Sequence, residues 1–253
     1  MQSVDRALSI MLLLSTCDQN GLPLSIISRS LDLNNSTCHH ILSTLKIRGF
    51  VNQDRHTKRY YLGGRTIELG KAAEEQVSLI RVAQPYMEEI KEEVQENIRL
   101  AVREGNYVVN VAQASPNRTV RMYTRVGDTM HLHATSVGKV LMAYLSKEEV
   151  EEIIDQTGLP KYTERTLCDP EKLCRELKQI KEQGYAADMG EWECDVACIA
   201  VPIFDYSGEV VASLGMSSPT SRASGERKKR IVPKLKKVAA SISRELGSFL
   251  KTS

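Results

Sequence analysis

The sequence predicts an α+β protein with two domains, on three observations. Its 253 residues exceed the usual size of one domain, and 42% of them are hydrophobic, enough for a substantial core. Apolar residues recur with the period of a helix through most of the N-terminal region, whereas strand-like alternation marks several later stretches. Residues 1–72 hold nine basic and five acidic side chains, while the remainder holds 25 basic and 27 acidic. A small positive domain therefore precedes a larger mixed one, and its charge predicts a polyanionic partner.

Two short helices are expected at the N-terminus. The first should begin with Ser3 as its cap and end near Cys17, before a turn. Its inward stripe is predicted to be Val4, Ala7, Leu8, Met11 and Leu12. The second should span residues 24–31 with Ile27 and Leu31 facing inward, and a tight turn at residues 32–34 follows.

A third helix, over residues 34–48, is predicted to have one apolar and one polar face. The apolar positions recur at i, i+3, i+4 and i+7: Cys38, Ile41, Leu42 and Leu45. The other face carries Ser36, Thr37, His39, His40, Ser43 and Thr44, and Asn34 or Asn35 can cap its first turn. A short, uncharged face rich in donors and acceptors suits a helix in the major groove of DNA. An ordinary solvated helix face is the alternative.

After Gly49, two short strands are predicted over residues 50–53 and 59–62, around a turn at residues 54–58. The basic side chains at the tip can reach phosphates or a minor groove, although a simple solvated turn is the alternative: they are Arg55, His56, Lys58 and Arg59. Two helices, a turn, a third helix and a hairpin make the winged helix-turn-helix arrangement, predicted for residues 1–64. The residues expected to contact DNA are Asn35, Ser36, Thr37, His39, His40, Ser43, Thr44, Lys46, His56, Lys58 and Arg59.

Residues 65–78 are predicted to form a linker helix, and residues 79–253 a second domain in which strand pairs alternate with helices. Strands are expected at residues 98–102, 107–112, 120–123, 197–204 and 210–216. Helices are expected at residues 79–95, 135–145, 147–155 and 171–183, and at the C-terminus, where Pro233 should lie in the first turn or kink the helix. Without Gly-rich phosphate loops, this pattern indicates an α+β sensor-like domain.

Several of the six cysteines occupy apolar or strand-like positions, which favours reduced thiols in the cytoplasm. Cys168, Cys174, Cys194 and Cys198 have spacings that match no zinc knuckle, so neither a metal nor a cofactor is expected. No segment approaches the roughly 20 apolar residues of a membrane span. We expect a soluble cytoplasmic protein without a membrane partner.

Several blocks together make the chain resemble the isocitrate lyase regulator (IclR) family of bacterial transcription factors, over nearly its whole length. In the first domain these blocks are residues 2–8 (QSVDRAL), 36–45 (STCHHILSTL) and 59–63 (RYYLG). In the second they are residues 132–139 (LHATSVGK), 184–185 (GY), 198–205 (CIAVPIFD) and 208–212 (GEVVA). Their order and spacing are more specific than any single block.

The resemblance implies a winged helix-turn-helix domain, a linker helix and a GAF-like effector-binding domain, assembled as homodimers or homotetramers on palindromic double-stranded operators. It also implies a cleft for a small organic acid, with free N–H groups at a helix N-terminus. The cleft residues carried over are Ala134, Thr135, Ser136, Gly138, Asp188, Glu191, Cys198, Ser217 and Ser218. For Cys198 a buried apolar thiol is the alternative, and for Glu191 a surface ion pair.

The chain departs from the family pattern at four positions. His40 replaces a common arginine, so phosphate contacts would depend more on Lys46 and the hairpin. Met130 and Asp195 also differ from many relatives, and Gly215 stands where some have a pocket serine. The identity of the ligand therefore cannot be transferred from a relative.

The function expected is that of a ligand-responsive transcriptional regulator of a catabolic operon, a repressor rather than an activator, and not an enzyme. One alternative is an enzyme that uses Cys198 as nucleophile with His131 or His133 as base. Another is a DNA-binding protein that has no ligand.

Overall fold

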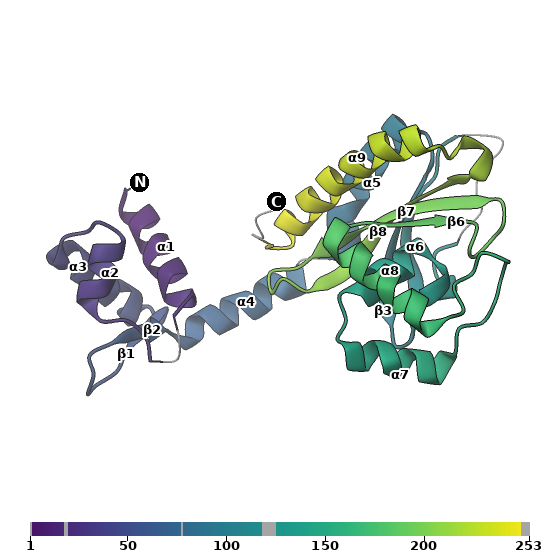
Figure 1. Ribbon diagram of the computed structural model, residues 1–253. Coiled ribbons are helices and arrows are strands. Elements are labelled where there is room, and N and C mark those ends of the chain that lie inside the picture. Colours follow the sequence, from purple (N-terminus) through teal and green to yellow (C-terminus); the bar gives the residue numbers. More distant parts are fainter. Residues whose placement is uncertain (1, 18–19, 77, 118–124, 249–253) are drawn as a thin grey trace. The chain divides into compact units, whose positions relative to one another are not determined.

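The computed structural model describes residues 2–17, 20–76, 78–117 and 125–248 (Figure 1). The chain divides into two compact units, residues 1–77 and residues 78–253, each with its own hydrophobic core. A helix-turn-helix unit with a hairpin precedes a larger α+β unit, which confirms the predicted fold class. In the part of the chain that is described, no helix is both long and apolar enough to cross a membrane.

Three helices and a hairpin enclose the core of the first unit: α1 (Gln2–Ser15), α2 (Leu24–Ser30), α3 (Asn35–Ile47), β1 (Val51–Gln53) and β2 (Tyr60–Leu62). The core residues are Ile10, Leu14, Ile27, Cys38, Leu42, Val51 and Tyr60. Asn34 caps α3 by accepting a hydrogen bond from the Thr37 N–H (2.7 Å), which confirms one of the two predicted caps. Gly49 ends the helix in a left-handed conformation (φ +77°). Helix α4 (Gly64–Gln76) follows the hairpin.

The prediction for α1 is wrong in two respects. The helix already includes Gln2, so Ser3 lies inside it and is not its cap. The stripe predicted to face inward is largely exposed, with Val4, Leu8 and Leu12 at 66%, 55% and 68% exposure, whereas Ile10 and Leu14 are buried. The segment is apolar on more than one face, and periodicity alone does not decide which face meets the core.

Among the described residues of the second unit, six strands form one antiparallel sheet in the order β5-β4-β3-β8-β7-β6. In chain order they are β3 (Asn97–Glu104), β4 (Tyr107–Ala114), β5 (Thr129–His131), β6 (Ala186–Met189), β7 (Val196–Phe204) and β8 (Val210–Pro219). The predicted strand at residues 120–123 lies outside the described residues. The short strands β5 and β6 have no counterpart among the predictions.

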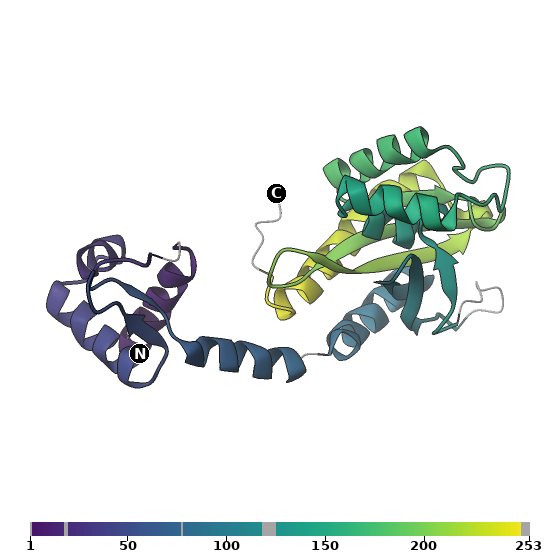
Figure 2. The ribbon, with the colours of Figure 1, turned by 90° about the horizontal axis from the view of Figure 1, so that it is seen from below.

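Helices cover both faces of this sheet (Figures 1 and 2). On one face lie α5 (Leu79–Val94) and α9 (Gly225–Glu245), which pack against alternate residues of β7 such as Ile199 and Val201. On the other lie α6 (Ser136–Ala143), α7 (Lys147–Thr157) and α8 (Pro170–Gln183). Because successive side chains of a strand point to opposite faces, β7 contributes side chains to the hydrophobic cores on both faces of the sheet.

Two helix boundaries differ from the predictions for a local reason. Helix α6 ends at Ala143, before Leu145, because Ser146 is extended and caps α7 in a capping box with Glu149. In α9 the Ser224 side chain caps the first turn, so the helix begins at Gly225 and Pro233 lies well inside it. The sequence did not reveal how far upstream of Pro233 this helix begins.

Candidate functional site

The exposed face of α3 is polar and contains no acidic side chain. Ser36, His39, His40, Thr44 and Lys46 are exposed, whereas Thr37 and Ser43 are half-buried. Although Asn35 is exposed, its side chain accepts a hydrogen bond from the Ser28 hydroxyl (2.7 Å) and so ties α3 to α2. The face therefore offers uncharged donors and acceptors beside one lysine, a composition compatible with base edges and phosphates.

The hairpin tip is held by Asp54. Its carboxylate accepts hydrogen bonds from the Thr57 N–H and hydroxyl and from the His56 N–H, and these bonds lower the pKa of Asp54. His56 and Lys58 are exposed at this tip. Arg59, predicted to lie with them, is half-buried and donates instead to the carbonyl of Gly21 (3.1 Å). Three of the four predicted basic side chains, including Arg55, are thus presented to solvent at the tip.

Gln53 connects the hairpin to α3. Its side chain accepts a hydrogen bond from Lys46 Nζ (3.1 Å) and donates one to the Lys58 carbonyl (3.1 Å). The only lysine of α3 is therefore held against the hairpin, which places the two polar surfaces next to each other.

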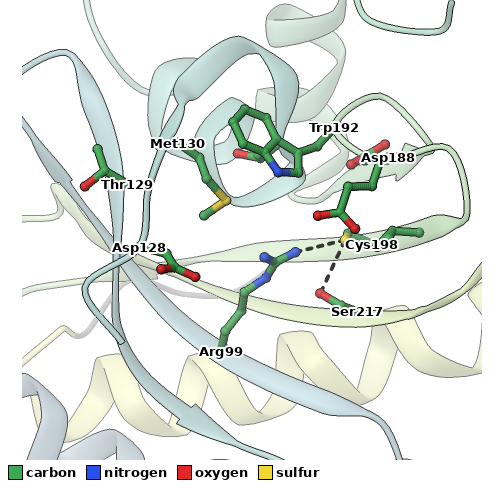
Figure 3. A pocket seen from close by; sticks show the side chains of 11 residues that line it. Arg99, Asp128, Thr129, Met130, Asp188, Trp192, Cys198 and Ser217 are labelled. Carbon is green, nitrogen blue, oxygen red and sulfur yellow. Dashed lines mark hydrogen bonds between the residues drawn. The ribbon is translucent and has the colours of Figure 1, made fainter. Parts of the chain in front are cut away.

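A cavity of about 180 Å³ opens on the α6 side of the C-terminal sheet (Figure 3). Four of the nine residues predicted for the effector site line it: Thr135, Asp188, Cys198 and Ser217. Seven further residues complete the lining: Arg99, Asp128, Thr129, Met130, Trp192, Glu193 and Val196. Pockets for drug-sized ligands measure about 300–1,000 Å³, so this cavity suits a smaller metabolite.

The other five predicted residues have different surroundings. Ala134 and Ser136 are buried beside the start of α6, and Glu191 is in an ion pair. Ser218 lines a second cavity, of about 210 Å³, near the N-terminus of α9. Gly138 has a packing role, since a Cβ atom there would lie 2.3 Å from the carbonyl oxygen of Leu132.

The N-terminus of α6 is less available to an anion than the sequence indicates. The Thr135 hydroxyl caps it by accepting a hydrogen bond from the Gly138 N–H (3.1 Å). Ser136 Oγ is buried and has no hydrogen-bond partner among the described groups. One of the N–H groups expected to meet a ligand is therefore already satisfied.

Arg99, which the sequence reasoning missed, is the buried cation of the cavity. It lies on β3 opposite Gly215 of β8 and is only 5% exposed. Its Nη2 donates to Cys198 Sγ (2.9 Å), whereas its Nε has no partner among the described groups. A Cβ atom on Gly215 would lie 2.6 Å from Val137 Cγ1 and 3.3 Å from Arg99 Cγ. The absence of a side chain at Gly215 thus makes room for the Arg99 side chain.

Cys198 is not placed to act as a nucleophile. Burial raises the pKa of its thiol, and its Sγ donates to Ser217 Oγ (3.3 Å). His131 contacts Tyr162, while His133 contacts the carbonyl of Pro160, and neither histidine is among the residues that line the cavity. The thiol therefore stays protonated, and neither histidine is placed to act as its base.

Asp188 and Glu191 belong to one buried polar network behind the cavity. Asp188 Oδ1 accepts the Glu191 N–H (2.7 Å), and burial raises the pKa of Asp188. Glu191 pairs with Lys139 Nζ (2.6 Å), which also contacts Glu176 (2.5 Å). The ion pair predicted as the alternative for Glu191 exists, but it is buried and not at the surface.

The cysteines form neither disulfides nor a metal site in the part of the chain that the structure covers. All six are free thiols. Among the described residues, no group of three or more histidine, cysteine, aspartate or glutamate side chains could hold a metal ion.

Two family models match the chain. "IclR helix-turn-helix domain" matches residues 3–55, and "Bacterial transcriptional regulator IclR C-terminal" matches residues 71–244. The chain is 35% identical over 230 residues to the HTH-type transcriptional regulator KdgR of Escherichia coli K12, covering 91% of this chain and 88% of that protein. It is 34% identical over 226 residues to the HTH-type transcriptional repressor AllR of the same organism, covering 89% and 83%. The crystal structure of Pseudomonas aeruginosa HmgR superposes with a TM-score of 0.81 at 25% identity, covering 99% of this chain and all of that one.

Proposed function

Because the chain belongs to the IclR family of transcriptional regulators, not to a family of enzymes, we propose that it controls a catabolic operon by binding a palindromic operator and releasing or retaining it according to a small effector. The observation that carries this proposal is the exposed face of α3, which is polar and free of acidic side chains, next to a basic hairpin tip. Under this proposal, residues 1–64 bind DNA, residues 65–78 link the domains and residues 79–253 sense the effector.

The proposed DNA contacts fall into two groups. Side chains of α3 read base edges: Ser36, Thr37, His39, His40, Ser43 and Thr44. Asn35, Lys46, His56, Lys58 and Arg59 position the unit on the phosphates, and Lys46 supplies positive charge in the absence of an arginine at position 40. Asn35 accepts a hydrogen bond from Ser28, and Arg59 donates one to the Gly21 carbonyl. Under this proposal, Asn35 and Arg59 therefore mainly support the other DNA-contacting residues.

Exposed apolar residues support a homodimer or homotetramer. Val4, Leu8 and Leu12 form a stripe at i, i+4 and i+8 on α1, and Ile67 and Leu69 are exposed on α4. Such side chains lose contact with water when a second copy covers them. A two-fold dimer would match the two half-sites of a palindromic operator.

The proposed mechanism is a shift between two arrangements of the paired DNA-binding units. An effector in the cavity of Arg99, Asp188, Cys198 and Ser217 acts only if it binds one arrangement more tightly than the other. We propose repression, because the relative AllR is a transcriptional repressor, and action in the cytoplasm, where a bacterial chromosome lies.

DNase footprinting on the region upstream of the protein's own gene tests this proposal. At low ionic strength, protection of two half-sites related by a two-fold axis, about one or two helical turns apart, supports it. Equal protection along the whole fragment, or none, would contradict it. A metabolite panel added to the same reactions separates a ligand-responsive regulator from a DNA-binding protein without a ligand.

A further inference from the structure

Arg99 is a buried cation that forms no ion pair with a described carboxylate, although the buried Asp188 is near enough to interact with it electrostatically. Among the described residues its guanidinium donates one hydrogen bond, to the Cys198 sulfur, and its Nε has no hydrogen-bond partner. The thiol of Cys198 is neutral because burial raises its pKa, so it supplies no counter-charge. Burying an unpaired charge is unfavourable, and a protein that keeps one in a cavity has a use for an anion at that position.

Three carboxylates line the cavity, beside the hydroxyls of Thr129, Thr135 and Ser217. Asp188 is buried beside Cys198, and Asp128 and Glu193 are exposed at the rim. Three carboxylates match a ligand with several hydroxyl donors. An aromatic acid would leave the buried carboxylate of Asp188 without a hydroxyl donor from the ligand, and an amine would have to bind next to the Arg99 guanidinium.

Trp192 supplies the remaining wall. Its ring lies against that of Tyr162, with centroids 4.2 Å apart, and it faces the same space as Arg99 and Met130 (Figure 3). A flat aromatic wall suits the C–H face of a short hydroxylated carbon chain.

From these contacts we infer that the effector is a small hydroxylated monocarboxylate whose carboxylate is bound by Arg99, and whose hydroxyls donate to Asp188 and the rim carboxylates. This inference rests on the proposed sensing role of the cavity. It assigns the anion to a guanidinium, which can hold a carboxylate with two parallel bonds, and not to the capped N-terminus of α6.

Thermal shift and calorimetry on the full chain test the inference with matched probes. The hydroxy acids are D-glycerate, L-threonate, D-gluconate and D-galactonate. D-Glucitol and D-glucamine replace the carboxylate of gluconate by an alcohol and by an ammonium group, and benzoate lacks hydroxyls. At least one hydroxy acid should bind saturably, whereas the other three probes should not. Binding of glucitol, glucamine or benzoate as tight as that of the best hydroxy acid, or binding of none of the four acids, would overturn the inference.

Substitutions then locate the carboxylate. Arg99→Gln should weaken binding of the best acid by at least about thirtyfold, and Arg99→Lys by less. Arg103→Gln is the matched control, since Arg103 lies on the same strand but pairs with Glu149 outside the cavity. Without ligand, Arg99→Gln and Arg99→Met should melt at the same temperature as the wild type or higher, because a buried charge that has no ion pair is removed. A lower melting temperature with unchanged ligand affinity would assign Arg99 a structural role and overturn the inference.

These experiments distinguish failure of the inference from failure of the proposed function. If the wild type binds its upstream DNA and an acid, but the Arg99 substitutions leave acid binding unchanged, only the inference is lost. If the wild type binds the acid through Arg99 but binds no DNA, the proposed function is lost and the inference stands.

Discussion

Lys139 Nζ lies 2.6 Å from Glu191 Oε1 in the interior of the C-terminal unit, and the Lys139 side chain is completely buried. Burial lowers the pKa of Lys139, but Glu191 and Glu176 more than offset this, so the net shift is upward and the ammonium stays charged. Since the Glu191 N–H also donates to Asp188, this pair ties the loop that carries Trp192 to Asp188 on β6, and both residues line the cavity.

Replacing Lys139 by methionine should destabilise the C-terminal unit strongly. The substitution leaves Glu191 buried without its counter-charge, at a cost of about 3–5 kcal/mol in the free energy of unfolding. Urea denaturation at pH 8 measures it. Lys147→Met is the control, because Lys147 pairs with Glu151 at the surface and should contribute less than about 1 kcal/mol. Equal effects of the two substitutions would show that the buried pair contributes no more to the free energy of unfolding than the surface pair does.

The stability of the unit should depend on pH through Glu191. Burial raises the pKa of Glu191 to about 7, above its value in the unfolded chain, so the folded state binds the extra proton. The free energy of unfolding should therefore fall as pH rises from about 4.5 to about 7, by up to roughly 3 kcal/mol from this group. Denaturation of wild type and Glu191→Gln across this range isolates the contribution. A wild-type curve parallel to that of the variant would contradict it.

His39 and Lys58 should affect DNA binding in different ways. His39→Ala removes a proposed base contact, so it should reduce discrimination against mutated operators by about 1–3 kcal/mol. Lys58→Ala should weaken binding to all sequences and reduce the salt slope by about one. Fluorescence anisotropy with native and mutated operators measures both, with Lys172→Ala on the exposed side of α8 as control. An equal loss on every sequence for His39→Ala would exclude base readout at this position.

Adding a side chain at Gly215 should disturb the cavity. The Cβ of Gly215→Ser would lie 2.6 Å from Val137 Cγ1, which forces a neighbour to move and should cost about 1–3 kcal/mol of stability. It would also displace Arg99, so ligand affinity should fall. Gly225→Ser, at the start of α9 with open space around it, is the control, because Gly225 like Gly215 has no positive φ. A stable Gly215→Ser protein with unchanged ligand affinity would contradict this account.

Helix α3 could be predicted from the sequence because its two faces differ in chemistry, and Cys38 and Leu42 are buried as expected. For α1 the prediction failed because its segment is apolar on more than one face. A family resemblance predicted four of the residues that line the first cavity: Thr135, Asp188, Cys198 and Ser217. It also predicted Ser218, which lines the second cavity, because adjacent residues of a strand point to opposite faces of the sheet.

Arg99 could not be found in this way. In the sequence it alternates with apolar residues, as an arginine on a solvated strand face does. Its burial follows from its pairing with Gly215, more than one hundred positions along the chain, and sequence alternation does not specify that register.

The central claim is that a ligand in the cavity of the second unit controls DNA binding by the first. The direct measurement is the dissociation constant for the native operator, with and without a saturating concentration of the best-binding hydroxy acid. We predict a change of at least about fivefold, with the reciprocal change in affinity for the acid when operator is present. Identical dissociation constants, for an acid shown to occupy the cavity, would contradict the claim.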